Sequence, residues 1–299
     1  MERFTFFLKN LKRYLRKTLQ NGNMPERNEI REKILTQLTD KLKAEKNIMA
    51  ELKKTDAYGH EAGAPAEEWV RLALLENKWN VFYPNQFLDE YLKPFKKDRA
   101  FIQTQLAKVW WSPLIITNKQ IVEFLAGKPI GRWQQEAADL VLFYGSEISK
   151  EPEKVILINV KSHEVNRDSR APNIISAQRL LEFCHFLLSQ SDVKSSLDKL
   201  DYWFIGVSWQ NDTKGAKIQG IFLKDLFKLD TEKIPQINFD AAIQIQWHVK
   251  DMKEIEQTKL QFIERLANSF ILQWRNHSKK KSDKYEILVK EINEKVKKA

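Results

Sequence analysis

The sequence predicts an α/β protein in which a β-sheet packs against helices. Two apolar runs rich in β-branched and aromatic residues, 139–144 and 155–161, are typical of paired strands joined by a polar turn. The chain has 299 residues, 42% of them hydrophobic, which is enough for one large domain of this class. Further strand-like runs follow the hairpin, at 201–209, 217–223 and 241–249.

Helices are expected ahead of the hairpin. Residues 26–55 carry apolar side chains at helical spacing and predict one surface helix or two. The Gly- and Pro-containing run 59–65 interrupts this pattern, and a new helix is expected from about Ala66. That start places Glu67 in the first turn, where a carboxylate suits the helix dipole. Its alternative role is to reach a metal site at the hairpin.

The remaining stretches predict short helices and a long C-terminal one. Residues 80–130 mix loops with short helices, the last of which ends at Gly127. After the hairpin comes a polar loop to about 173, then a helix that begins near Ile174 and buries Cys184. Residues 260–299 predict a long helix or two with a Lys-rich end.

Composition favours a polyanionic partner in a reducing compartment. Lys and Arg number 50 against 40 Asp and Glu, a net charge of +10, which suits nucleic acid or an anionic surface. A solubilising surface excess would give the same balance. The single Cys184 excludes an internal disulfide, and we expect neither a membrane span nor a signal peptide. Residues 1–23 are basic and amphipathic. Contact with a membrane surface or with DNA, a helix packed on a partner, and an upstream extension of the reading frame before Met24 all remain open.

The hairpin brings chemistry-bearing side chains together. Side chains alternate along a strand, so Asn159 and Lys161 share one face with Val155 and Leu157. Asp139 begins the neighbouring strand. Oxygen ligands with a cation beside them suit Mg²⁺-assisted phosphodiester chemistry.

These features resemble the PD-(D/E)XK nuclease superfamily, and more closely the type II restriction endonucleases of the HincII type. The resemblance covers roughly 55–275. The most specific blocks are Ala-Pro-Asn-Ile-Ile-Ser-Ala at 171–177 and Gln-Ile-Gln-x-His-Val at 244–249. The other blocks, in the same order along the chain, are Gly59-His60 through Glu67, Ser112-Pro113, Gly127-Lys128, Ala138-Asp139 and Val160-Lys161.

The resemblance implies an EcoRV-like core with a central mixed β-sheet flanked by helices. It implies a homodimer in the cytoplasm of a bacterium that uses Mg²⁺ to cut double-stranded DNA at a short palindrome, with blunt ends. It assigns metal binding to Asp139 and position 159, the catalytic lysine to Lys161 and, more weakly, a helix carboxylate to Glu67. The positions it places against the DNA are Lys128, Arg170, Ala171, Asn173 and Asn238.

Asn159 departs from this pattern, because the family has a carboxylate there. An amide oxygen can ligate a hard cation but carries no charge, so Mg²⁺ binding should weaken. Three explanations compete: a natural variant compensated by Glu67 or Glu136, a substitution introduced to block cleavage, or a homologue that binds DNA without cutting it. Arg170 also differs, since the best-known member of the family has a Gln there that wedges into the DNA.

The expected domain organisation has three parts. Residues 1–55 form a basic helical extension, 56–275 the catalytic and DNA-binding domain, and 276–299 a Lys-rich helix or tail.

Overall fold

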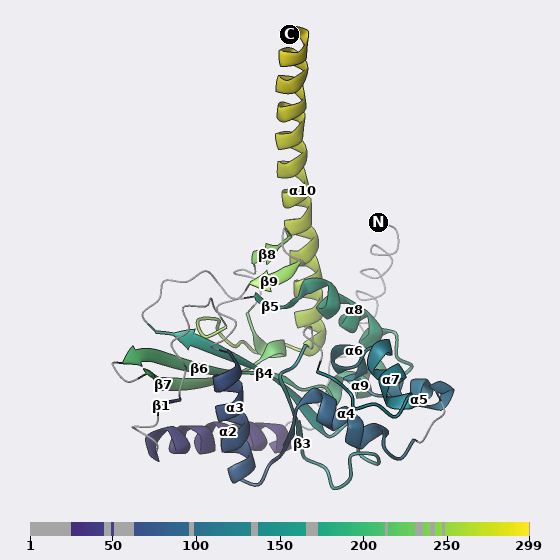
Figure 1. The fold of residues 1–299 in the computed structure, drawn as a ribbon, viewed down its shortest axis with the longest axis vertical. Helices are drawn as coiled ribbons and strands as arrows, with labels where there is room; N and C mark the ends of the chain where they lie inside the picture. The colour runs from purple at the N-terminus through teal and green to yellow at the C-terminus, as the bar shows by residue number, and fades with distance from the viewer. Residues whose placement is uncertain are drawn as a thin grey trace.

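The computed structural model describes a mixed β-sheet with helices on both faces (Figure 1), which confirms the predicted fold class. Within the described part of the chain, the strands of the main sheet follow the order β1-β7-β6-β4-β3-β2. The β4 and β6 strands are parallel and the other neighbours are antiparallel. The described residues are 25–44, 49–50, 63–95, 99–132, 137–165, 173–212, 215–230, 236–239, 243–246 and 249–298.

The predicted hairpin is present at the centre of this sheet. Its strands are β3 (Leu140–Phe143) and β4 (Val155–Glu164), and Leu140 lies opposite Ile158. The remaining strands of the sheet are β1 (Met49–Ala50), β2 (Asn80–Phe82), β6 (Tyr202–Asp212) and β7 (Gly215–Asp225).

Two apolar clusters cover the two faces of the sheet. On one face, α2 (Pro25–Ala44) and α3 (Gly63–Glu76) pack on Ile156 and Ile158. On the other face, Val155 and Leu157 pack under the remaining helices. Those helices are α4 (Pro84–Leu92), α5 (Arg99–Leu106), α6 (Ser112–Ile115), α7 (Asn118–Leu125), α8 (Ala177–Leu188), α9 (Val193–Asp198) and the start of α10 (Lys259–Lys298). The predicted alternation along β4 is therefore confirmed.

A second, smaller sheet lies beside α10 (Figure 1). It has the order β5-β9-β8, built from β5 (Asn173–Ser176), β9 (Gln244–Gln246) and β8 (Gln236–Asn238). The side chains of Ile175, Ile237 and Ile245 are buried in the same cluster as α8 and the start of α10. This sheet, which we call sheet B, is thus anchored to the body by its apolar face.

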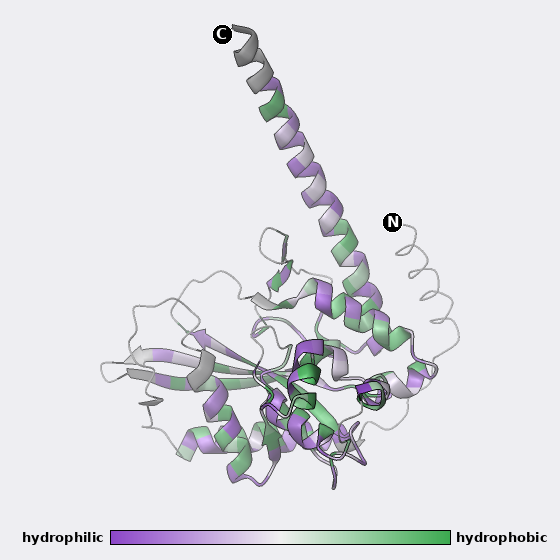
Figure 2. Ribbon diagram, turned by 45° about the vertical axis from the view of Figure 1, so that its right-hand side comes forward, coloured by the Kyte–Doolittle hydropathy of each residue, from purple (hydrophilic) through white to green (hydrophobic). Residues whose placement is uncertain are grey.

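The α10 helix runs well beyond the body. Its first turns are buried, whereas the later ones project into solvent and are mostly hydrophilic (Figure 2). The sequence left open one long helix or two, and the structure has one. None of the described helices combines the length and the apolar character needed to cross a membrane.

Several element boundaries correct the sequence predictions. The helix predicted over 26–55 ends at Ala44, and Met49–Ala50 instead pairs with β7. The α3 helix begins at Gly63, so Glu67 lies beyond its first turn and a capping role for it is wrong. The helix expected from Ile174 begins at Ala177, because Asn173–Ser176 pairs with β9.

Smaller differences concern short elements. The 80–130 region contains the strand β2, which pairs with β3, and of 241–249 the described strand is Gln244–Gln246. After β7 the chain forms the 3₁₀ turn η1 (Leu226–Lys228). The amphipathic segment 1–23 and Glu136 lie outside the described residues.

Candidate active site and DNA-binding surface

Asp139 is fixed where β3 begins. Its backbone N–H donates to the carbonyl of Ile158 at 2.9 Å, and its Oδ2 accepts from the backbone N–H of Val160 at 2.6 Å. These bonds lock the carboxylate against the last buried part of β4. An acidic side chain held by a backbone N–H keeps a defined direction and leaves its other oxygen available to a ligand.

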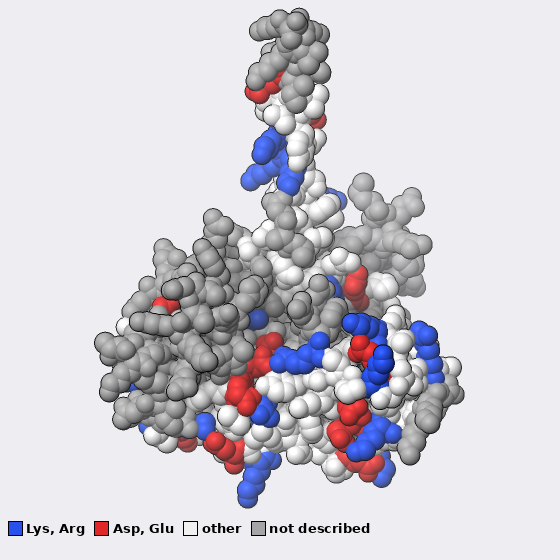
Figure 3. Space-filling model, viewed as in Figure 1, with Lys and Arg blue, Asp and Glu red and all other residues white. Residues whose placement is uncertain are grey.

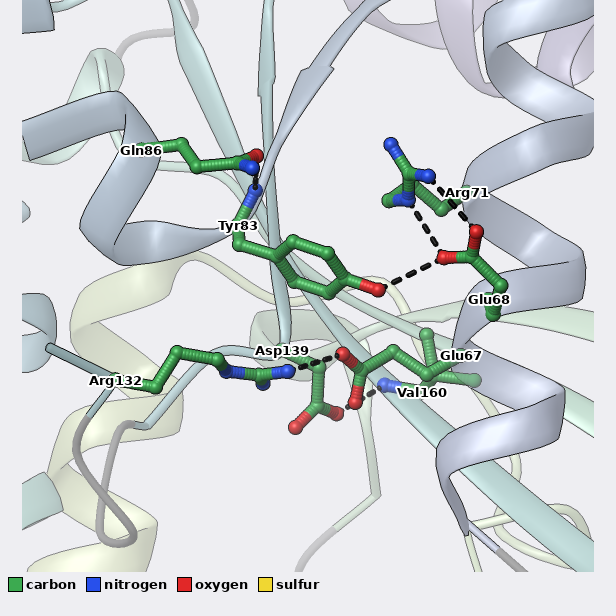
Figure 4. A network of polar contacts seen from close by, with 8 residues as sticks. All are labelled: Glu67, Glu68, Arg71, Tyr83, Gln86, Arg132, Asp139 and Val160. Carbon is green, nitrogen blue, oxygen red and sulfur yellow. Dashed lines mark hydrogen bonds and ion pairs between the residues drawn. The ribbon is translucent and has the colours of Figure 1, made fainter.

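Glu67 reaches the same place from α3. Its side chain is 14% exposed and pairs with Arg132, with Nη1 2.9 Å from Oε1 (Figure 4). Burial raises the pKa of Glu67, and the negative charge of Asp139 raises it further, while Arg132 opposes both effects. Two carboxylates from different elements therefore converge, which is an arrangement that a bound cation would relieve.

Arg132 was not singled out from the sequence. Its guanidinium lies 4.6 Å from the ring centre of Tyr83, whose hydroxyl donates to Glu68 at 2.8 Å. Glu68 in turn accepts from Arg71 at 2.7 Å. This network ties the candidate site to α3 and to the chain before α4 (Figure 4). Only the three-dimensional structure shows that Arg132 joins it, because this residue lies 65 positions after Glu67 in the chain.

Lys161 stands beside both carboxylates. It is half-buried on β4, opposite Gly206 of β6. Burial lowers the pKa of its ammonium group, and the charges of Asp139 and Glu67 counteract this. A Cβ at Gly206 would meet the ring of Phe222 at 1.9 Å, so glycine is what allows this ring to lie beside the lysine's strand. The ammonium group of Lys161 therefore loses its proton more readily here than it would in water.

Asn159 is buried with 3% exposure, and its amide is only partly satisfied. Its Nδ2 donates to the carbonyl of Ala137 at 3.2 Å, and the hydroxyl of Tyr202 donates to the same carbonyl. Among the described residues, its Oδ1 has no hydrogen-bond partner. A buried polar atom without a partner is costly and points to a missing ligand or water.

The described residues contain no group of three or more His, Cys, Asp or Glu side chains placed to hold a metal. Asp139 and Glu67 supply two carboxylates, so the amide oxygen of Asn159 is the remaining candidate donor. The set consists of oxygens alone, which suits a hard cation such as Mg²⁺ rather than zinc.

The predicted DNA contacts are distributed over two places. Lys128 is exposed and directly follows Gly127, which has a positive φ of 69° at the end of α7. The backbone N–H groups of Gly127 and Lys128 donate to the carbonyls of Phe124 and Glu123, respectively. Asn173 and Asn238 lie on β5 and β8, the two strands that flank β9. Arg170 and Ala171 are outside the described residues.

Sheet B also presents two amides that were not among the predicted contacts. Gln244 and Gln246 alternate with the buried Ile245, so they lie on the opposite, partly exposed face. Asn238 pairs with Gln244 in register and shares that face. The alternation of the Gln-Ile-Gln block carried this signal in the sequence.

Comparisons with known proteins identify relatives of this chain. The family model for the restriction endonuclease HincII matches residues 41–295. The chain belongs to the HincII restriction endonuclease family. It is 27% identical over 207 residues to the type II restriction enzyme HindII of Haemophilus influenzae strain Rd. The aligned region covers 66% of this chain and 73% of that protein. The type II restriction enzyme HincII of Haemophilus influenzae gives the same identity and coverage. Family membership makes the chain a type II restriction endonuclease, a DNA-binding hydrolase of the site-specific deoxyribonuclease class.

Proposed function

We propose that this restriction endonuclease cuts both strands of duplex DNA at a short palindrome, leaving blunt ends, with Mg²⁺ as cofactor and as a homodimer. The convergence of Asp139, Glu67 and Lys161 beside the middle of β4 carries the proposal. Two carboxylates and a partly desolvated lysine are what a metal-assisted attack of water on a phosphodiester requires.

Asp139 and Asn159 would hold the metal, with Glu67 beside it. The Oδ1 of Asn159 lacks a protein partner among the described residues, and the carboxylates of Glu67 and Asp139 repel each other. Both features fit a bound cation. When bound, Mg²⁺ polarises the phosphate and lowers the pKa of coordinated water.

Lys161 would contact the scissile phosphate and orient the attacking water. Its lowered pKa makes the amine form more accessible, so it can also accept the proton of that water. Arg132, paired with Glu67 in this structure, holds that carboxylate in place and keeps a positive charge at the mouth of the site.

The amide face of sheet B is the proposed base-reading surface. Gln and Asn side chains match the donor and acceptor pattern of adenine in the major groove. Asn238, Gln244 and Gln246 supply such groups, and Asn173 lies across from Gln246 in register. Lys128, just after α7, would add a cation at a second place on the DNA. A two-fold symmetric dimer then matches a palindromic site, and sedimentation of the purified chain with a duplex measures whether two copies bind.

Digestion of phage DNA with Mg²⁺ tests the proposed function. We expect discrete fragments whose sequenced ends give one palindrome and flush cuts. Asp139→Ala should reduce cleavage by at least about a thousandfold, because the fixed metal ligand is lost. A matched control is Asp89→Ala on the exposed face of α4, which should cut normally. Site-specific gel shifts without cleavage by the unmodified protein, in either Mg²⁺ or Mn²⁺, would instead establish a DNA-binding homologue that is silent because of Asn159.

A further inference from the structure

We propose that the projecting part of α10 is a DNA-backbone clamp that binds phosphates flanking the recognition site. The inference rests on the proposed function, since it places the DNA on sheet B. It concerns residues 275–290, whose side chains are exposed apart from the half-buried His277. The cations of this segment are Arg275, Lys279, Lys280, Lys281, Lys284 and Lys290, against the acids Asp283 and Glu286.

The α10 helix is fixed to the outer edge of sheet B. Gln273 accepts a hydrogen bond from the backbone N–H of Ile237 at 3.0 Å, on the edge strand β8. The ring of Phe239 lies 5.7 Å from Phe270, and it lies 5.2 Å from Trp274 and 5.1 Å from His277. Three successive turns of α10 therefore face the sheet, and their direction is set by tertiary contacts.

The face of α10 that touches sheet B continues as a cationic face beyond it. A helix turns by about 100° per residue, so positions spaced by three and four share one side. The spacing from Phe270 through Trp274 and His277 next reaches Lys281 and Lys284, and Lys280 flanks them. Lys281 and Lys284 stand roughly 6 and 10 Å past His277 along the axis.

Duplex DNA is the occupant that fits these features. DNA on the amide face of sheet B must extend past the edges of so small a sheet, and α10 stands at the β8 edge (Figure 1). Basic side chains gather on the projecting helix (Figure 3), where they are complementary to phosphates. Such contacts carry no sequence information but fix orientation and raise affinity in a salt-dependent way.

The opposite face of the same segment provides a matched control. Arg275, Lys279 and Lys290 lie on the side turned away from sheet B, by the same helical spacing. Substituting these three residues removes as much charge from the same helix as substituting Lys280, Lys281 and Lys284, and the side chains are similarly exposed. The comparison therefore separates a directed contact from a general electrostatic attraction.

Fluorescence anisotropy with 40-base-pair random-sequence duplexes at 50–250 mM NaCl tests the proposal. We expect K280Q/K281Q/K284Q to weaken binding about 10- to 100-fold at 100 mM salt and to reduce the salt slope by about 2.7. R275Q/K279Q/K290Q should stay within about threefold of the unmodified protein. The replacement K280R/K281R/K284R should restore binding, and equal thermal midpoints would exclude unfolding.

Other outcomes overturn the proposal. Equal losses of DNA affinity in the two triple variants would show only a general electrostatic attraction to the positively charged helix. No loss of affinity in either variant would show that DNA binds without α10. A change from dimer to monomer on sedimentation of K280Q/K281Q/K284Q would assign this face to a second copy of the chain. Lysine-dependent flotation with anionic vesicles, with unchanged DNA binding, would assign it to a lipid surface. Failure of the unmodified protein to bind DNA would overturn the proposed function as well.

Discussion

Asn159 is the residue at which fold and catalysis place different demands. Its Nδ2 donates to the carbonyl of Ala137, which the protein needs as a satisfied buried contact. Its Oδ1, unpartnered among the described residues, is available to a cation. An aspartate here would bring a full charge to the metal but would turn an oxygen toward the Ala137 carbonyl. The amide therefore favours the metal-free fold at the expense of metal affinity.

Asn159→Asp should lower the stability of the metal-free protein and raise its affinity for Mg²⁺. Without metal, we expect a loss of about 1–3 kcal/mol in the free energy of unfolding, because a buried carboxylate replaces a hydrogen-bond donor. With saturating Mg²⁺ the loss should shrink, and the Mg²⁺ concentration for half-maximal cleavage should fall about tenfold. Urea unfolding with and without Mg²⁺, together with cleavage titrations, measures both effects.

Asn159→Ala is the control for that variant. It removes the donor and the oxygen together, so stability should fall while the Mg²⁺ requirement for cleavage rises. If Asn159→Asp left the Mg²⁺ dependence unchanged, position 159 would not touch the metal.

At this scale the sequence predicted the alternation along β4, which placed Asn159 and Lys161 on one face. It did not predict that Glu67 would pair with Arg132. Alternation is a local property of the strand, whereas the ion pair joins α3 to a loop after α7 and depends on the packing of both. The burial that lowers the pKa of Lys161 likewise comes from distant elements.

Among the elements, strand β5 shows how a non-local partner overrides a local pattern. Ile174 and Ile175 continue the helical spacing of α8, so the sequence predicted a helix there. Pairing with β9, about seventy residues later, holds Asn173–Ser176 extended and delays the helix to Ala177. Ser176 then caps α8 by accepting from Arg179 N–H. The short pair β1–β7 has the same origin, because no local signal marks it.

Strand β9 carries the prediction for sequence recognition. Gln244→Leu and Gln246→Leu, each made in the Asp139→Ala background, should weaken binding to the cleaved palindrome by about 5- to 100-fold. Binding to random-sequence duplex should change less than twofold, because phosphate contacts remain. Competition gel shifts with both duplexes give the two affinities.

Gln103→Leu on the exposed face of α5 is the matched control, and it should leave both affinities unchanged. Equal weakening of specific and random duplexes by the β9 variants would mean that these amides contact the backbone or support the fold, not the bases.

At the scale of the whole molecule, a buried ionic cluster joins elements that lie on opposite faces of the main sheet. Asp201, at the start of β6, lies 2.8 Å from Nε of Arg27 on α2. Lys259, the first residue of α10, donates to the carbonyls of Leu197 and Leu200. The buried Asp225 completes the cluster. Charged side chains thus join the base of the projecting helix to both faces of the main sheet, and no sequence pattern announces this arrangement.

This cluster should make stability fall as pH rises from the acid range toward neutrality. Burial raises the pKa of Asp201 to about 7, against opposition from Lys259 and Arg27. The unfolded chain has a value of about 3.9, so the folded protein binds more protons between roughly pH 4 and 7, and each rise in pH there favours unfolding. The resulting loss in the free energy of unfolding is at most about 4 kcal/mol, and it is complete once the pH exceeds the pKa of the folded protein.

Asp201→Asn isolates this effect, because the amide cannot ionise. Urea unfolding from pH 5 to 8 should show that the variant loses less stability with rising pH than the unmodified protein does. The stability of the variant relative to the unmodified protein should therefore be greater at pH 8 than at pH 5. Asp225, whose pKa burial also raises, should leave a residual slope of the same sign. The lowered pKa of Lys259 acts in the opposite sense, so the difference between the two proteins is the informative quantity. Parallel pH profiles would show that the carboxylate of Asp201 stays ionised, with its pairing to Arg27 and Lys259 outweighing its burial.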